Sequence, residues 1–131
     1  MERTFMQALE SRRTFYAIGS KSPVSDDQIE EVIKFAVKHV PSAFNSQSTR
    51  VVVLLGENHK RVWNIAKDIL RKIVPAEAFK GTEEKINNCF LAGYGTVLYF
   101  EDQDVVKGLQ DQYPSYADNF PVWSQQTSAM H

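Results

Sequence analysis

The sequence predicts an α+β protein that folds as a single domain over residues 1–131, and three observations lead to that fold class. Its length is that of one hydrophobic core, and a composition of 43% hydrophobic and 24% charged residues is typical of a globular chain. Several segments carry apolar residues at helical spacing. Two short runs of consecutive apolar residues have the pattern of buried strands. The expected order is α, α, β, α, α, β, with a central sheet flanked by helices.

Two helices are predicted before the first strand. The first should end near Arg12 and Arg13, and its apolar stripe consists of Phe5, Ala8 and Leu9. In the second, Ser25 and Gln28 have the spacing of a capping box. Apolar residues then follow at strict helical spacing: Ile29, Val32, Ile33, Ala36, Val37 and Val40. We expect this helix to end before Pro41.

The two strands are predicted at 51–55 and 96–100, each covered on both faces. Gly56 should close the first strand. A third helix is expected over 59–74, because its apolar stripe stops at Pro75. A shorter helix should precede the second strand, with one face formed by Ile86, Cys89 and Phe90.

Beyond Glu101 the chain turns polar and then aromatic, so we expect a loop through 113–123 and a last helix that begins at Ser124. Tyr116 and Trp123 in this loop either line a ligand pocket or close an interface, and the interface interpretation is slightly favoured. Two strands are too few for a stable open sheet. A partner, or residues outside this chain, should complete it.

The charge of the chain and its lack of a long apolar run argue against two classes of partner, nucleic acids and membranes. The formal net charge is −1, from 15 basic and 16 acidic residues, which provides no basic stripe for nucleic acid. No apolar run approaches the roughly 20 residues that span a bilayer, so we expect no membrane partner and a cytoplasmic location.

Cys89 and Trp63 are interpreted as core residues. No metal site is expected, because the histidines have no ligand at metal-site spacing: His39, His59 and His131.

Two polar clusters are candidates for a binding site. Arg12, Arg13 and Thr14 offer two guanidinium groups and a hydroxyl, which suits a phosphate. The alternative is a helix C-terminus with cations that offset its dipole. The loop 41–48 contains hydroxyl and amide side chains that can read the polar edge of a ring, namely Ser42, Asn45, Ser46 and Gln47. The alternative is an ordinary polar connector.

The two clusters together resemble the nitroreductase family. Arg-Arg-Thr at 12–14 is followed about 30 residues later by Pro-Ser-Ala-Phe-Asn-Ser-Gln at 41–47, as in the N-terminal part of that family. The stretches 95–110 and 115–126 are similar to the branch that contains the copper-induced bacterial nitroreductases and the yeast fatty-acid-repression flavoproteins. The resemblance covers essentially the whole chain. It implies a nitroreductase-like fold whose C-terminal part lies outside this chain.

The resemblance also implies a function. Family members are homodimers that bind FMN and pass electrons from NAD(P)H to quinone-like or nitroaromatic acceptors by a ping-pong mechanism. By this likeness Arg12, Arg13 and Thr14 bind the FMN phosphate and ribityl end, while the isoalloxazine is bordered by Ser42, Asn45, Ser46 and Gln47. The chemistry occurs on the flavin, so no catalytic side chain is expected. The alternative is a non-catalytic flavin-binding or regulatory module that keeps the fold.

Overall fold

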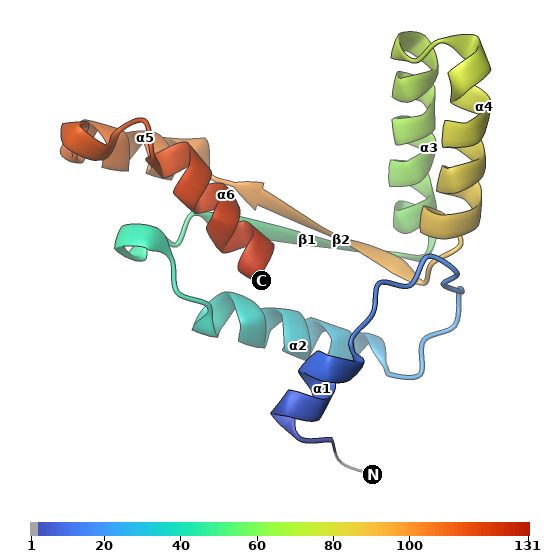
Figure 1. Cartoon of the computed structure of the whole chain (residues 1–131), viewed down its shortest axis with the longest axis horizontal. Helices are drawn as coiled ribbons and strands as arrows, with labels where there is room; N and C mark the ends of the chain where they lie inside the picture. Colours follow the sequence, from blue (N-terminus) through green and yellow to red (C-terminus); the bar gives the residue numbers. More distant parts are fainter. Residues whose placement is uncertain (1–2) are drawn as a thin grey trace. The chain divides into compact units, whose positions relative to one another are not determined.

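The computed structural model describes residues 3–131, which divide into two compact units (Figure 1). The first unit contains the described residues up to Lys21 together with Glu57–Tyr94, and the second contains Ser22–Gly56 together with Gly95–His131. Each unit is built from segments that are distant in the sequence. The loop with the candidate amide cluster belongs to the second unit.

The second unit contains the sheet, which consists of strands β1 (Thr49–Leu55) and β2 (Gly95–Glu101) side by side in antiparallel register (Figure 1). Both strands were predicted, and each is slightly longer than expected. At one end of the pairing, Thr49 lies opposite Glu101. At the other end, a Cβ on Gly95 would lie 2.5 Å from Leu55 Cδ2 and 3.0 Å from the Leu54 carbonyl oxygen, so any larger residue there would force the Leu55 side chain to shift.

The expectation that both faces of the strands are covered is wrong for this chain. Val52 and Phe100 lie on the same face and are 43% and 50% exposed. The helix that packs on both strands is α6 (Phe120–Met130). A run of consecutive apolar residues therefore predicts a strand, but it does not reveal whether the same chain covers the second face of the sheet.

Helix α2 (Asp26–His39) begins and ends as predicted. Ser25 and Gln28 form the capping box, since each side chain accepts a hydrogen bond from the other residue's backbone N–H. The backbone turns away from the helix at Val40, the residue before Pro41. Loop 41–48, which contains the short 3-10 turn Ala43–Asn45, then leads to β1.

Helix α5 (Gln103–Gln112) lies in the polar segment after Glu101, for which no helix was expected. Asp102 is its N-cap and accepts from the backbone N–H groups of Asp104 and Val105, and the helix buries Val106. Polar residues occupy most of this helix, so its short apolar stripe did not indicate a helix in the sequence. The 3-10 turn Pro114–Tyr116 follows, and α6 begins four residues earlier than the predicted Ser124. Pro121 is tolerated there because the first helical turn needs no N–H partner.

The first unit is helical. It contains α1 (Phe5–Ser11), α3 (Gly56–Ile73) from Glu57 onward, α4 (Ala76–Lys85) and the π-helical turn Ile86–Phe90. The helix predicted before the second strand, with Ile86, Cys89 and Phe90 on one face, corresponds to α4 together with the π-helical turn that continues it. Trp63 stacks on Phe90 with ring centroids 4.7 Å apart, and Arg71 of α3 pairs with Glu83 of α4 at 2.9 Å. These contacts hold α3 and α4 together as an antiparallel pair.

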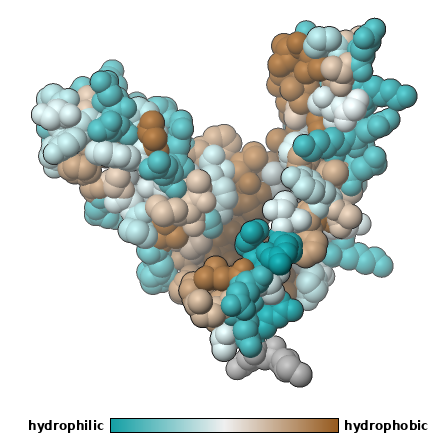
Figure 2. Space-filling view, in the orientation of Figure 1, coloured by the Kyte–Doolittle hydropathy of each residue, from teal (hydrophilic) through white to brown (hydrophobic). Residues whose placement is uncertain are grey.

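Many apolar side chains reach the surface, as the brown areas of Figure 2 show. Val32 and Phe35 on α2 are 69% and 66% exposed. Within residues 3–131, no helix is both long and apolar enough to cross a membrane. The same described residues contain no group of three or more His, Cys, Asp or Glu side chains arranged to hold a metal ion.

Candidate functional site

The loop between α2 and β1 has an unusual backbone. Phe44, Asn45 and Gln47 have positive φ angles of 55°, 53° and 48°, in the left-handed region that non-glycine residues seldom adopt. Local hydrogen bonds stabilise this path, because Ser42 Oγ accepts from the backbone N–H of Gln47 at 3.1 Å and the Ser42 carbonyl accepts from that of Asn45 at 3.0 Å. Such strain persists only where the surrounding structure fixes it, and it is concentrated at functional sites.

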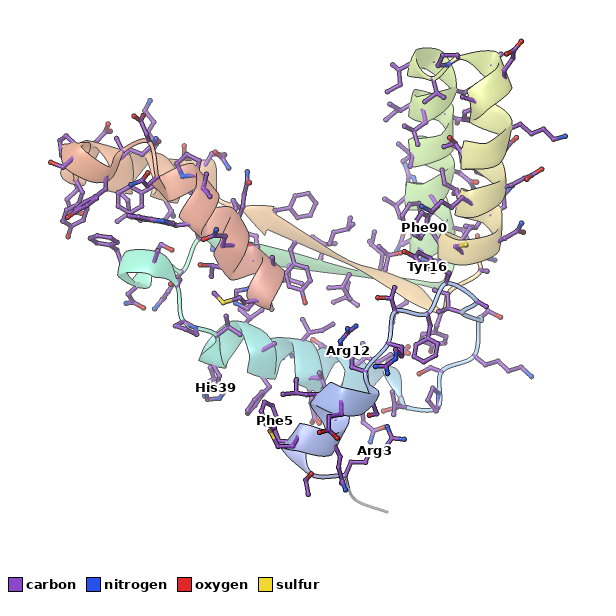
Figure 3. The ribbon with its side chains drawn as sticks, in the orientation of Figure 1. Arg3, Phe5, Arg12, Tyr16, His39 and Phe90 are labelled. Carbon is purple, nitrogen blue, oxygen red and sulfur yellow. The ribbon has the colours of Figure 1, made fainter. Side chains whose placement is uncertain are left out.

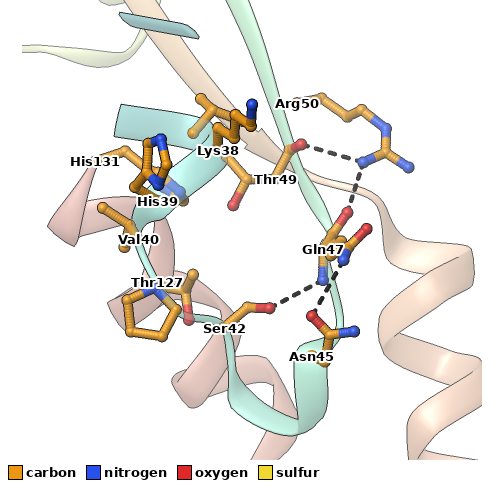
Figure 4. Close-up of a pocket in the computed structure, with 12 residues that line it drawn as sticks. Lys38, His39, Val40, Ser42, Asn45, Gln47, Thr49, Arg50, Thr127 and His131 are labelled. Atoms are coloured by element: carbon orange, nitrogen blue, oxygen red, sulfur yellow. Dashed lines mark hydrogen bonds between the residues drawn. The ribbon is translucent and has the colours of Figure 1, made fainter. Parts of the chain in front are cut away.

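Three of the four predicted loop residues line one pocket of about 500 Å³ (Figure 4). They are Ser42, Asn45 and Gln47, and the amide nitrogen of Gln47 donates to the side-chain oxygen of Asn45 at 3.1 Å. Among the described residues, neither the Asn45 amide nitrogen nor the Gln47 amide oxygen takes part in a hydrogen bond. One donor and one acceptor therefore remain available at the pocket for a ligand.

The rest of the pocket has a basic character. Its lining includes four side chains that carry or can acquire positive charge, namely Lys38, His39, Arg50 and His131. Arg50 is partly neutralised, since its guanidinium pairs with Asp102 at 2.8 Å. It also donates to the Gln47 carbonyl at 2.9 Å, which ties the end of the loop to the first strand (Figure 4).

Ser46, the fourth predicted loop residue, is half-buried and does not belong to this lining. Its hydroxyl lies 3.4 Å from that of Ser48, which is completely buried. The loop thus has Ser42 and the two amide side chains at the pocket, whereas the hydroxyl groups of Ser46 and Ser48 lie on its inner side.

Phe44 lies at the centre of an aromatic cluster and was not predicted as a site residue. Its ring centroid is 4.9 Å from Tyr113, 5.2 Å from Phe120 and 6.0 Å from Trp123, with the last pair stacked at 15°. Phe44 and Trp123 also line a second pocket of about 460 Å³. Phe44 stands in the middle of the motif at 41–47. Its role could not be predicted from the sequence, because its aromatic partners lie about 70 residues further along the chain.

Arg12, Arg13 and Thr14 belong to the other compact unit and follow the last turn of α1 (Figure 3 labels Arg12). All three are exposed. The Arg13 guanidinium donates to the carbonyls of Glu10 and Arg12 at 2.9 and 2.8 Å, as expected of a cation at a helix C-terminus. The Arg12 side chain makes no hydrogen bond or ion pair within the described residues, so its donors are available to a ligand.

Comparison with known proteins identifies the family. Residues 9–131 match the nitroreductase family, which is nearly the whole chain. The chain belongs to the nitroreductase family, as the motifs at 12–14 and 41–47 predicted.

Individual relatives agree with this assignment. The nitroreductase FRM2 of Saccharomyces cerevisiae is 33% identical over 127 residues, which cover 95% of this chain. Among solved structures, the nitroreductase CinD from Lactococcus lactis, in complexes with nicotinic acid, chloramphenicol and 4-nitrophenol, matches with TM-scores of 0.75, 0.79 and 0.75 and identities of 42%, 41% and 43%. A nitroreductase crystal structure from Saccharomyces cerevisiae matches with a TM-score of 0.78 at 28% identity and covers 96% of this chain. The nitroreductase-like fold is therefore confirmed.

The match covers only part of each relative. This chain spans 62% of the length of FRM2, 63% of the CinD chain and 68% of the yeast crystal structure. The described fold accordingly corresponds to about two thirds of the family fold.

Proposed function

We propose that this chain serves in a homodimeric, FMN-dependent oxidoreductase that uses NAD(P)H to reduce quinone-like or nitroaromatic acceptors. The observation that carries the proposal is the pocket lined by Ser42, Asn45 and Gln47, which combines amide groups, a strained loop and the family motif. FMN, when bound, supplies the redox chemistry, and nicotinamide and acceptor use it in turn in a ping-pong cycle.

The side chains of the loop fit the polar edge of a flavin. That edge alternates carbonyl and N–H groups, and the free amide nitrogen of Asn45 and amide oxygen of Gln47 offer one donor and one acceptor. The hydrogen bond between the two amides restricts their rotamers, so less entropy is lost when they bind a ring. A donor beside a ring carbonyl also stabilises negative charge that develops there.

The arginine cluster fits the phosphate end of FMN. Arg12 is exposed and its guanidinium can bind two phosphate oxygens at once, while the Thr14 hydroxyl can donate to a third. Arg13 contributes positive charge from its position over the end of α1. We propose that the loop of one copy and the arginine cluster of a second copy bind the same flavin.

Two observations, on a relative and on the aromatic lining, support the proposed acceptor class. CinD has been solved with the nitroaromatic 4-nitrophenol and with nicotinic acid, both of them flat rings. In this chain the stacked pair Phe44 and Trp123 lines the second pocket, where a flat ring can stack. We infer that flat aromatic acceptors are the substrates.

An FMN titration followed by a turnover assay tests the proposal. After incubation with FMN and removal of the free cofactor, the purified chain should retain flavin absorbance. Its melting temperature should rise with FMN concentration, and it should then oxidise NADH or NADPH when a quinone or a nitroaromatic is present. If the chain binds flavin but does not oxidise NAD(P)H, the result would favour a non-catalytic flavin-binding module over an enzyme. If neither the flavin absorbance nor the melting temperature changes, the proposal fails for this chain.

A further inference from the structure

A network of buried and half-buried hydroxyl groups surrounds Glu101 at the end of β2. Ser48 is 0% exposed and donates its hydroxyl hydrogen to Glu101 Oε2 at 2.6 Å. The Ser128 hydroxyl of α6 donates to the other carboxylate oxygen, Oε1. Thr49 Oγ1 lies 3.1 Å from Ser128 Oγ, and Ser46 Oγ lies 3.4 Å from Ser48 Oγ. One carboxylate therefore joins the loop, both strands and α6.

This network fixes the point where the strained loop ends. The side chain of Ser48 is held by Glu101, and its backbone carbonyl accepts from the N–H of Asp102 at 2.9 Å. Ser48 is thus bonded through both its side chain and its backbone. The loop just before it carries the three residues with positive φ, whose conformation is retained only if its surroundings hold it.

We propose that Glu101 is a positioning residue that sets the conformation of loop 42–47 and thereby the affinity of the site for FMN. The flavin part of this inference rests on the function proposed above. Glu101 acts through Ser48 and belongs to neither pocket lining, so it is outside the binding machinery itself. A carboxylate suits this role, because its two oxygens accept from two hydroxyl donors at once.

Three variants separate positioning from general stability. Glu101→Ala removes both acceptors and leaves the buried Ser48 hydroxyl without its partner. Glu101→Gln keeps one acceptor for Ser48 and offers an N–H that Ser128 Oγ can accept. Val106→Ala is the matched control, because Val106 is a buried residue of the same unit, 2% exposed, that lies in helix α5 and in neither pocket.

The first readout is FMN affinity, measured by titration alongside urea unfolding of each variant. Glu101→Ala should bind FMN about tenfold more weakly, while Glu101→Gln should stay within about threefold of the unmodified chain. Val106→Ala should lose stability and keep its FMN affinity. If Val106→Ala weakens FMN binding as much as Glu101→Ala does, Glu101 acts only through stability and the proposal is overturned.

The second readout needs no flavin and so separates this proposal from the proposed function. Amide hydrogen exchange of Asn45, Ser46 and Gln47 in the flavin-free chain should be about tenfold faster in Glu101→Ala than in Val106→Ala, because the hydrogen bonds inside the loop open more often. If the unmodified chain binds no FMN, the proposed function fails and this comparison still decides the role of Glu101. Equal exchange rates in the two variants would overturn the proposal.

Discussion

Arg12 and Arg13 are neighbours in sequence but differ in what their side chains contact. Arg13 donates to two carbonyl groups at the end of α1, which offsets the negative end of that helix. Arg12 is exposed and makes no such contact. Of the two residues, Arg12 therefore offers the sharper test of phosphate binding.

Replacing Arg12 by alanine should weaken FMN binding at least tenfold, since each charge-assisted hydrogen bond contributes about 1.5–3 kcal/mol. Riboflavin lacks the phosphate and should bind the variant and the unmodified chain alike, which paired titrations with the two ligands measure. Arg3→Ala is the control, because the exposed Arg3 precedes α1, donates a hydrogen bond to Ser11 at the other end of that helix, and should change neither affinity. An equal loss of FMN and riboflavin would show that Arg12 supports the fold instead.

The sequence predicts site residues whose neighbours in the site are close in sequence, and it does not reveal those whose partners are distant in sequence. Ser42, Asn45 and Gln47 stand within six positions, so a loop pattern was enough to group them, and they do line one pocket. Ser48 depends on Glu101, 53 positions away, and no local pattern reveals that pairing. The positive φ of Phe44 is also invisible, because nothing in the residue type favours it.

Among the helices, the capping box of α2 was predicted and can be measured. Ser25→Ala removes the hydroxyl that accepts from the Gln28 N–H at 3.2 Å, and it should lower the free energy of unfolding by about 1 kcal/mol. Ser25→Asp keeps a capping acceptor and should cost only a few tenths of that. Urea unfolding of the three proteins measures the difference. If both variants were equally stable, the cap would contribute nothing.

The junction between β1 and α3 depends on Gly56, whose φ is +54°. A Cβ there would meet no atom within 4 Å, so Gly56→Ala is opposed by backbone strain alone and should destabilise the fold by about 1 kcal/mol. Gly81→Ala, within α4 and equally uncrowded, should instead stabilise by about 0.5–1 kcal/mol. Thermal unfolding of the pair should shift in opposite directions, and a shift in the same direction would contradict the strain argument.

Helix α5 could not be predicted from the pattern of apolar residues. Helix α5 has an N-cap at Asp102 and an apolar pair at Val105 and Leu109, but polar residues occupy most of its remaining positions. The cap geometry and the burial of Val106 decide its formation. By contrast, α2 and the third helix carry long apolar stripes and proline stops, and for that reason they were found.

For the whole molecule, the fold followed from the family resemblance more than from the pattern of elements. An antiparallel pair of strands with one open face is marginal in isolation, and Val52 and Phe100 lie on that face. The exposed side chains of Val32 and Phe35 on α2 add further apolar surface in the same unit. We expect another chain segment to cover these residues, and the sequence patterns alone do not identify it.

We predict that a second copy supplies this cover and that dimerisation and FMN binding are linked. A homodimer would bury the open face and the exposed α2 residues, and it would let the loop of one copy reach a flavin held by the arginine cluster of the other. Because FMN would then bind the dimer and not the separated chains, it should shift dissociation to lower protein concentration by mass action. Sedimentation across a dilution series, with and without FMN, measures this shift.

Two variants of helix α2 test the same linkage. Val32→Glu places a charge on the exposed α2 surface and should weaken both dimerisation and FMN affinity, whereas Glu30→Gln on the same helix should change neither appreciably. A monomer that binds FMN at full stoichiometry would refute the shared site.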